Sequence, residues 1–264
     1  MHILCRAMQM ALLKGEVLMR NTLLASGLLL AVVNAHALEA GDIAFTSFNT
    51  DEDGWAIVAL ADLPMDTVIY FTENEWNGEA LGVGGAFNSG EAVYTWSLGA
   101  EAVAAGAVVR FSGVNRAADR SASAGALSAT GTANLAGGGD GLFAYIGADD
   151  ANPSGFLAAI SNDGFVGDQL NGTGLILGTT AVALDAGTRF GTYVGPRSGA
   201  SVFGSYASTV NNAADWSIFK VASADAEPDL TPFSVAAAVP EPESYAMMLA
   251  GLGLLAGIAR RRRG

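Results

Sequence analysis

The chain has 264 residues and a formal net charge of −13, from 26 acidic and 13 basic residues. Most basic residues lie near the two ends, so the long middle part is strongly acidic, which argues against nucleic acid as a partner. The single cysteine and both histidines lie at or before His36. The body beyond them therefore has no Ser-His-Asp triad, no Cys-His nucleophile, no zinc site of the usual kind and no disulfide.

A short apolar run marks the amino-terminal part. Residues 23–33 carry no charge, follow Arg20 and precede the small-x-small pattern from Ala35 to Ala37. A basic region, an apolar run and an A-x-A exit are typical of a secretory signal peptide. The run is shorter than the roughly 20 residues that a bilayer span needs. We therefore expect a signal helix, export by the Sec machinery, and cleavage by signal peptidase after Ala37.

The true start of translation has two interpretations. The residues before Met19 lack the pattern of a signal, whereas a well-formed signal begins at Met19 itself. We expect translation to start there. The alternative is a long leading region that is removed with the rest of residues 1–37, which leaves the mature body unchanged.

The body, residues 38–224, has the pattern of one all-β domain. Short stretches of β-branched, aromatic or alternating residues are separated by Gly, Asn, Asp and Ser clusters typical of turns. No long helical stripe occurs between the two ends. The pattern predicts a single β-sandwich or irregular barrel, with strands at 42–48, 55–61, 68–72, 91–97, 108–112, 142–146, 156–160, 189–194 and 216–221.

The opening of the body carries a resemblance. Residues 41–45 through 71–76 resemble the first part of secreted bacterial β-domains, of the lamin-tail type of immunoglobulin-like sandwich. The resemblance implies this fold class and no activity.

The turn after the first predicted strand has the spacing of a calcium loop. Asn49, Asp51 and Asp53 alternate as in D/N-x-D-x-D-G, and Gly54 permits a sharp turn. Leu60 stands where the bidentate Glu is expected, and the loop joins strands rather than helices. The turn is therefore either a polar hairpin turn or a weak Ca²⁺ site, and no other cofactor is expected.

Glu73, Glu75 and Trp76 gather in the loop after the predicted strand at 68–72. A sugar ring can stack on an indole while polar side chains bind its hydroxyls, so these residues are a candidate glycan contact. One alternative is that Trp76 caps the end of the sandwich. Another is that Glu73 and Glu75 form the carboxylate pair of a glycosidase.

Three further predicted turns are rich in acidic residues or in glycine. Residues 149–152 and 162–164 are acidic turns, for which backbone preference is one explanation and metal binding the other. Residues 137–141 are rich in glycine but lack the Lys-Ser/Thr of a P-loop, so we expect a flexible turn before the next strand.

The carboxy-terminal part begins with a predicted linker at 225–238, which contains two prolines. Pro240, Glu241 and Pro242 follow directly, and their prolines hold the backbone extended. We expect these residues to act as a spacer between the body and the apolar segment behind them.

The apolar segment at 245–259 carries no charge and is followed by a cluster of four arginines. As a helix it would be about 22 Å long, and arginine side chains that snorkel would extend its reach toward the ~30 Å of a hydrocarbon layer. The positive-inside rule holds such a cluster on the cytoplasmic side, so the body faces outward. The cluster consists of Arg260, Arg261, Arg262 and Arg263.

Together these parts, over residues 239–264, closely resemble the PEP-CTERM sorting tail of Gram-negative bacteria. The resemblance implies recognition by an exosortase, a membrane cysteine protease-transpeptidase, and processing near the Pro-Glu-Pro motif. It also implies transient or retained contact with the inner membrane. In that family the tail accompanies exopolysaccharide production and biofilm or floc formation. The alternative is an ordinary tail anchor that stays uncut.

Three hypotheses follow from the sequence. The leading one is an exported, non-enzymatic protein of the cell envelope or extracellular matrix, associated with exopolysaccharide. The second is a carbohydrate- or Ca²⁺-dependent adhesion module that uses the Trp76 loop and the turn at 49–53. The third is an extracellular hydrolase that works with carboxylates.

Overall fold

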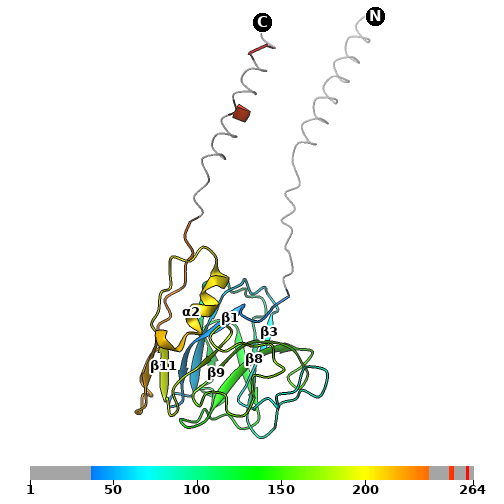
Figure 1. Ribbon diagram of the computed structural model, residues 1–264, viewed down its shortest axis with the longest axis vertical. Coiled ribbons are helices and arrows are strands. Elements are labelled where there is room, and N and C mark those ends of the chain that lie inside the picture. The colour runs from blue at the N-terminus through cyan, green and yellow to red at the C-terminus, as the bar shows by residue number, and fades with distance from the viewer. Residues whose placement is uncertain (1–36, 238–249, 253–259, 262–264) are drawn as a thin grey trace, which may run out of the picture. The chain divides into compact units, whose positions relative to one another are not determined.

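The computed structural model describes residues 37–237, 250–252 and 260–261 (Figure 1). The chain divides into two units, Met1–Ala37 and Leu38–Gly264, and the fold described here belongs to the second. The predicted signal helix lies outside the described residues, as does most of the predicted tail helix.

Two six-stranded sheets make up the described body. In spatial order, the first sheet contains β12 (Trp216–Phe219), β11 (Phe190–Tyr193), β1 (Ile43–Asn49), β2 (Gly54–Ala59), β5 (Val108–Ser112) and β6 (Ser121–Ala122). The second contains β10 (Ala181–Ala183), β9 (Pro153–Ser161), β8 (Gly141–Gly147), β3 (Val68–Thr72), β4 (Val93–Ser97) and β7 (Ala126–Thr130). Only β9 and β10 pair in parallel among these strands.

The two sheets pack face to face through aromatic side chains. Trp55 of β2 lies 5.2 Å from Phe71 of β3 between ring centroids, and Phe111 of β5 lies 5.2 Å from Trp96 of β4. All four rings are buried. The predicted all-β sandwich is therefore confirmed, because residues that alternate along each strand place their large rings on one face.

The outer face of the second sheet has its own apolar cluster. Phe143 and Tyr145 alternate with the inward residues of β8 and pack with Trp76, Phe156 and Phe165. Trp76 and Phe165 come from the loops after β3 and β9. Both faces of this sheet are thus buried over part of their area, which explains why β8 and β9 have near-continuous apolar sequences.

All nine predicted strands exist, with ends shifted by up to a few residues. The sequence analysis missed β6, β7 and β10. In β7 every second residue is exposed, and Leu127 is its one large apolar side chain, so the sequence shows no clear apolar alternation. β6 and β10 have only two and three residues, too short for any periodicity.

The chain beyond β12 packs against the first sheet instead of forming a free linker, which corrects the prediction for 225–238. We call residues 222–236 the strap. The side-chain amide of Asn49 donates to Ser223 O at 3.0 Å, and Phe233 N donates to Gly106 O at 2.8 Å. Phe233 is only 3% exposed, so the strap includes a core residue.

The two ends of the sandwich carry different elements, a short helix at one end and a group of acidic side chains at the other. At the helix end, a short helix α2 (Tyr206–Val210) follows the 3₁₀ turn η1 (Phe203–Ser205) and precedes η2 (Ala213–Asp215). Gly41, just before β1, lies against Ala207 of this helix. The Tyr206 hydroxyl donates to Ser234 O at 2.7 Å. Both the first residues of the body and the end of the strap therefore meet at the helix end.

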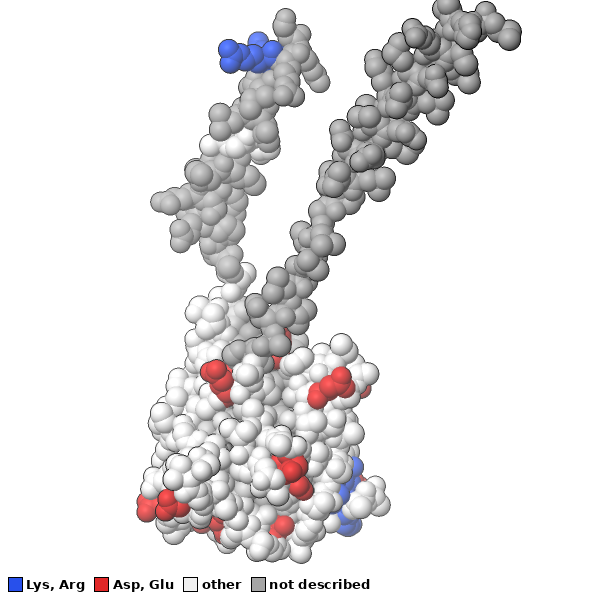
Figure 2. Space-filling model, turned by 90° about the vertical axis from the view of Figure 1, so that its right-hand side faces the viewer, with Lys and Arg blue, Asp and Glu red and all other residues white. Residues whose placement is uncertain are grey.

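The opposite end, which we call the carboxylate end, carries the turn at 49–54 between β1 and β2. Leu135 N donates to the Asp53 carboxylate at 2.8 Å, which joins the loop before β8 to this turn. Acidic side chains are spread over the face of the body in Figure 2, as the composition predicts.

Candidate functional site

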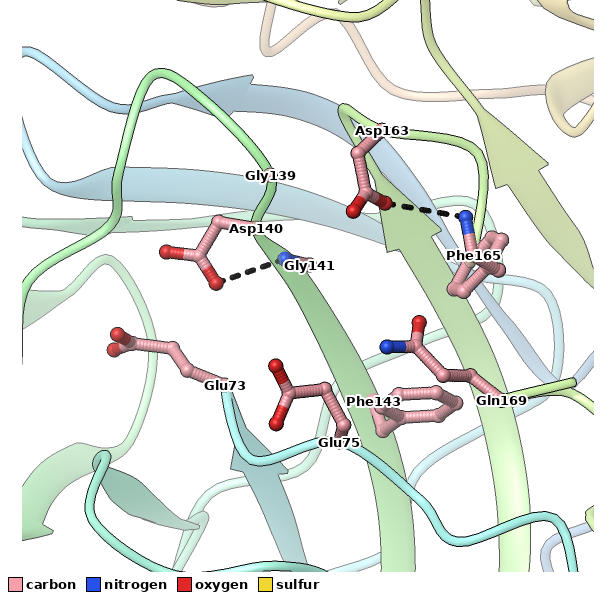
Figure 3. A pocket seen from close by; sticks show the side chains of 9 residues that line it. All are labelled: Glu73, Glu75, Gly139, Asp140, Gly141, Phe143, Asp163, Phe165 and Gln169. Atoms are coloured by element: carbon pink, nitrogen blue, oxygen red, sulfur yellow. Dashed lines mark hydrogen bonds between the residues drawn. The ribbon is translucent and has the colours of Figure 1, made fainter. Parts of the chain in front are cut away.

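Four carboxylates line one pocket at the carboxylate end (Figure 3). Glu73 and Glu75 follow β3, Asp140 precedes β8, and Asp163 follows β9. These three strands are neighbours in the second sheet, so their ends bring the four side chains to one edge. No Lys or Arg lines this pocket. The cavity volume is about 10 Å³, which is room for roughly one water molecule.

Glu73 is the most buried of these acids, at 4% exposure. The Tyr94 hydroxyl donates to Glu73 Oε1, and Asn134 N donates to Glu73 Oε2 at 3.4 Å. Burial raises the pKa of Glu73 to about 7, against the opposing effect of the Tyr94 hydrogen bond. Glu73 therefore holds a proton under mildly acidic conditions in which an exposed Glu is ionised.

Asp140 organises the loop that carries it. Its carboxylate accepts hydrogen bonds from Ala136 N at 2.7 Å and Gly141 N at 2.9 Å. Burial raises the pKa of Asp140 to about 6, although these backbone donors act in the other direction. The Asp140 side chain thus connects the two ends of the glycine-rich turn at 137–141 by hydrogen bonds.

Two further acids share the electrostatics of this pocket. Burial raises the pKa of Glu91 to about 7, with repulsion from Asp140 and Glu75 acting in the same direction. Glu91 Oε2 accepts no hydrogen bond, whereas Glu75 accepts one from the Asn88 side chain. Burial therefore raises the pKa of three acids here, so that Glu73, Glu91 and Asp140 hold a proton more readily than exposed carboxyl groups do.

The pocket as it stands cannot hold a sugar ring. Its volume suits about one water molecule, and Glu73 is engaged by Tyr94. A glycosidase pair needs two carboxyl groups that flank an accessible glycosidic bond. This pocket therefore lacks the space that a glycosidase pair at Glu73 and Glu75 would need.

Trp76 is not available as a stacking surface, which corrects the predicted glycan contact. The indole is 2% exposed, and its Nε1 donates to Glu79 O at 2.9 Å. Its ring meets Phe87 and Phe156 edge to face, with centroids 5.0 and 4.9 Å away. Trp76 instead covers the outer face of the second sheet, close to the capping role given as the alternative.

The turn at 49–53 uses its oxygens for protein partners. The Asp51 carboxylate accepts from Arg189 Nε at 2.9 and 3.0 Å, and also from Ser223 N at 2.7 Å. Asn49 Oδ1 accepts from Asp51 N at 3.0 Å, which closes the turn. Asp53 points to Leu135 N. Among the described residues, no group of three or more His, Cys, Asp or Glu could hold a metal ion. These contacts favour the hairpin-turn interpretation.

The acidic turn at 149–152 is closed in the same local way. Asp149 Oδ1 accepts from Ala151 N at 3.0 Å and from the Asn152 side chain at 2.6 Å. The turn at 162–164 has a larger role, which the sequence analysis missed. Asn162 is fully buried, and its amide donates at 3.0 Å to both Ala136 O and Thr188 O.

The sequence analysis found Glu73 and Glu75 but missed Asp140 and Asp163 as members of the same pocket. It also missed Tyr94, which donates to Glu73, and Glu91, which is repelled by Asp140 and Glu75. The members are spread over 97 residues from Glu73 to Gln169 in sequence, so no spacing motif joins them. A usable signal was that an acid stands within three residues of the end of three predicted strands. These ends come together only through the order of the strands in the sheet, which cannot be read from the sequence.

Most of the predicted sorting residues lie outside the described residues: Ala35, Pro240, Glu241, Pro242, Arg262 and Arg263. Ala37, Arg260 and Arg261 are described, and all three are exposed. In the parts of the chain that the structure describes, no helix has the length and apolarity needed to cross a bilayer.

Comparison with known proteins gave one match. Neither the curated proteins nor the solved structures contain a match to this chain, so the lamin-tail resemblance stays a prediction. Residues 238–263 match the PEP-CTERM protein-sorting motif. The matched range covers all three predicted parts of the tail, and the chain is therefore a protein that carries a PEP-CTERM sorting motif at its carboxy-terminal end.

Proposed function

We propose that this protein is exported, handled by an exosortase in the inner membrane of a Gram-negative bacterium, and delivered to the cell envelope or extracellular matrix. The match of residues 238–263 to the sorting motif is the observation that carries this proposal. The motif implies exosortase processing and sorting to the bacterial surface. The predicted signal peptide supplies the route across the inner membrane.

The body would serve as a displayed, non-enzymatic module in an exopolysaccharide matrix. Two features support this part of the proposal. The carboxylates that could have suggested catalysis are engaged in holding loops, as with Asp140 and its two backbone donors. The body also contains neither Cys nor His beyond His36, which removes the common nucleophile and base pairs.

Substitutions at the motif test the sorting step. Glu241→Ala is expected to abolish processing, so that a longer product accumulates in the membrane fraction of the native host. Glu243→Ala is the matched control, because it removes the same charge two residues further on. Immunoblots of membrane, surface and medium fractions would report both. Unchanged distribution of the Glu241→Ala product, or full-length wild-type protein in the cytosol, would contradict the proposal.

The association with polysaccharide needs its own test. The purified body is expected to be retained on the host's own exopolysaccharide, and a host strain that makes no exopolysaccharide provides the control material. Trp76→Ala should not be used as a binding probe, because this ring is part of the core. Loss of the body into the flow-through on both materials would limit the proposal to sorting alone.

A further inference from the structure

We propose that the strap, residues 222–236, decides which end of the displayed sandwich faces away from the membrane. This inference rests on the proposed function, because it assumes that the sorting tail holds the precursor at a membrane. With the strap docked, the carboxylate end faces outward and the helix end faces the membrane.

The last strand of the sandwich ends at the carboxylate end. Phe219, its final residue, lies opposite Phe190, and Phe219 O accepts from Arg189 N at 2.9 Å. Arg189 in turn pairs with Asp51 in the turn at 49–54. Without further contacts, the chain beyond β12 would therefore leave the body at the carboxylate end.

The strap carries the chain from that end to the other. It begins where Ser223 N donates to Asp51 at 2.7 Å, and it continues past Arg110 of β5, which pairs with Glu227. It finishes where Ala236 N donates to Ala200 O at 2.8 Å, close to α2. The point at which the chain leaves the folded body is thereby moved along the whole length of the first sheet.

Arg197 fixes the second half of the strap. Its guanidinium donates to Thr231 O at 2.9 Å and to Asp229 O at 3.1 Å, and it pairs with the Asp229 carboxylate at 3.2 Å. The same group lies 4.9 Å above the centre of the Phe233 ring. Its side chain is 10% exposed and that of Asp229 is 51% exposed. The cation–π contact with Phe233 is therefore largely desolvated, whereas the ion pair faces solvent on its acidic side.

Chain length limits how far the body can turn. Ala236 and Tyr245, where the apolar segment begins, are nine residues apart, which allows at most about 31 Å of extended chain. β9 alone, with nine residues, is ~30 Å long. With the strap docked, the carboxylate end can therefore reach the membrane only if these nine residues are fully extended, and the helix end is favoured there. Release of the strap would let the chain leave at Phe219 with up to about 90 Å of slack, and this preference would be lost.

Energy transfer from the body to labelled lipid tests this orientation. The body has no cysteine beyond Cys5, so single thiols can be placed by Gly138→Cys at the carboxylate end and Ser201→Cys at the helix end, each with Cys5→Ser. Both positions are exposed. The full chain would be purified from membranes of a host without the processing enzyme, and a donor dye would be attached to its single thiol. It would then be placed in phosphatidylethanolamine–phosphatidylglycerol vesicles that contain rhodamine-labelled lipid.

Transfer is expected to be greater from position 201 than from position 138. With Arg197→Ala and Phe233→Ala added, the difference should vanish or reverse. Arg116→Ala is the matched control, because it removes an arginine that pairs only at the surface with Asp119. It should leave the order unchanged. If the variant with Arg197→Ala and Phe233→Ala fails to fold, as its melting curve would show, Asp229→Asn is the milder replacement.

In the chain with an unchanged strap, equal transfer from the two positions, or greater transfer from position 138, would by itself overturn the inference. A chain that floats with the vesicles but shows equal transfer contradicts only the orientation. A chain that fails to float with the vesicles contradicts the proposed membrane handling and the orientation together.

Discussion

Two groups of acidic side chains lie at the carboxylate end of the sandwich, and their surroundings are opposite. In the turn at 49–54, the hydrogen bond from Arg189 lowers the pKa of Asp51. In the neighbouring pocket, burial raises the pKa values of Glu73 and Asp140 to about 7 and about 6. The same residue type is thus a fixed anion in one place and a proton carrier in the other, because only the first has a cation beside it.

Asn162 stands between the two groups, and its replacement should have the largest effect. Its side chain joins Ala136 and Thr188, and its Oδ1 accepts from Asp140 N at 2.7 Å. Asn162→Ala would leave these buried groups unpaired, so we expect the free energy of unfolding to fall by about 3 kcal/mol.

Urea unfolding followed by tryptophan fluorescence would measure this loss. The control is Asn152→Ala, since that exposed amide reaches only Asp149, and it should change the free energy of unfolding by about 0.5 kcal/mol or less. Equal effects of the two substitutions would mean that Asn162 does not connect the loops.

The pocket should make the protein less stable as the pH rises. Because the folded state holds the Glu73 proton more tightly than the unfolded chain does, stability is fully present below the ordinary pKa of 4.5 and is lost as the pH approaches about 7. Glu73→Gln imitates the protonated side chain. It should raise the free energy of unfolding by about 2 kcal/mol near pH 8, with little effect near pH 4.

Chemical unfolding of the wild-type and Glu73→Gln proteins over this pH range is the measurement. Glu79→Gln, at an exposed position of the following loop, is the matched control and should leave the pH dependence as it is. A parallel pH dependence for wild type and Glu73→Gln would show that Glu73 titrates as an ordinary carboxyl.

The Asp51 pair should respond in the opposite direction and more weakly. A lowered pKa contributes stability above the ordinary value of 3.8, and that contribution disappears as the pH falls. Asp51→Asn should therefore destabilise the protein at neutral pH and have little effect in acid. The loss should also shrink at high salt, since the Arg189 side chain is 42% exposed. Asp185→Asn, which breaks the exposed pair with Lys220, should cost less still.

Calcium should have the smallest effect of all. The Asp51 carboxylate is occupied by Arg189 and Ser223, and Asp53 is directed to Leu135. We therefore expect the melting temperature of the body to be the same with millimolar Ca²⁺ and with chelator. A clear rise with Ca²⁺ but not Mg²⁺ would restore the calcium-loop interpretation of the turn.

Sequence patterns predicted the strands well where large side chains decide burial. Val68–Thr72 and Val108–Ser112 match their predicted bounds, because β-branched and aromatic residues recur there. The same reasoning failed for β7, in which Leu127 is the one large apolar residue and the apolar signal is weak. It also failed for Trp76, where an aromatic beside polar residues suggested a surface site and the ring is buried.

The strap and the pocket depend on contacts that no local pattern contains. Prolines and acids at 225–232 indicate a linker, yet Arg197 and Phe233 dock this segment on residues far away in the chain. Glu73 and Asp140 acquire their raised pKa values only when separate strand ends meet. Sequence reasoning identified the sorting motif because its three parts are contiguous, and missed the pocket because its parts are not.

Intact-mass analysis of the protein from the envelope and the medium of its native host tests the central claim most directly. The account predicts a product that begins at Leu38 and ends beyond Ala236, within or near the Pro-Glu-Pro motif, so that the folded body keeps its strap. Recovery from the cytosol of a chain with both ends uncut, or of a product cut inside residues 222–236, would contradict it.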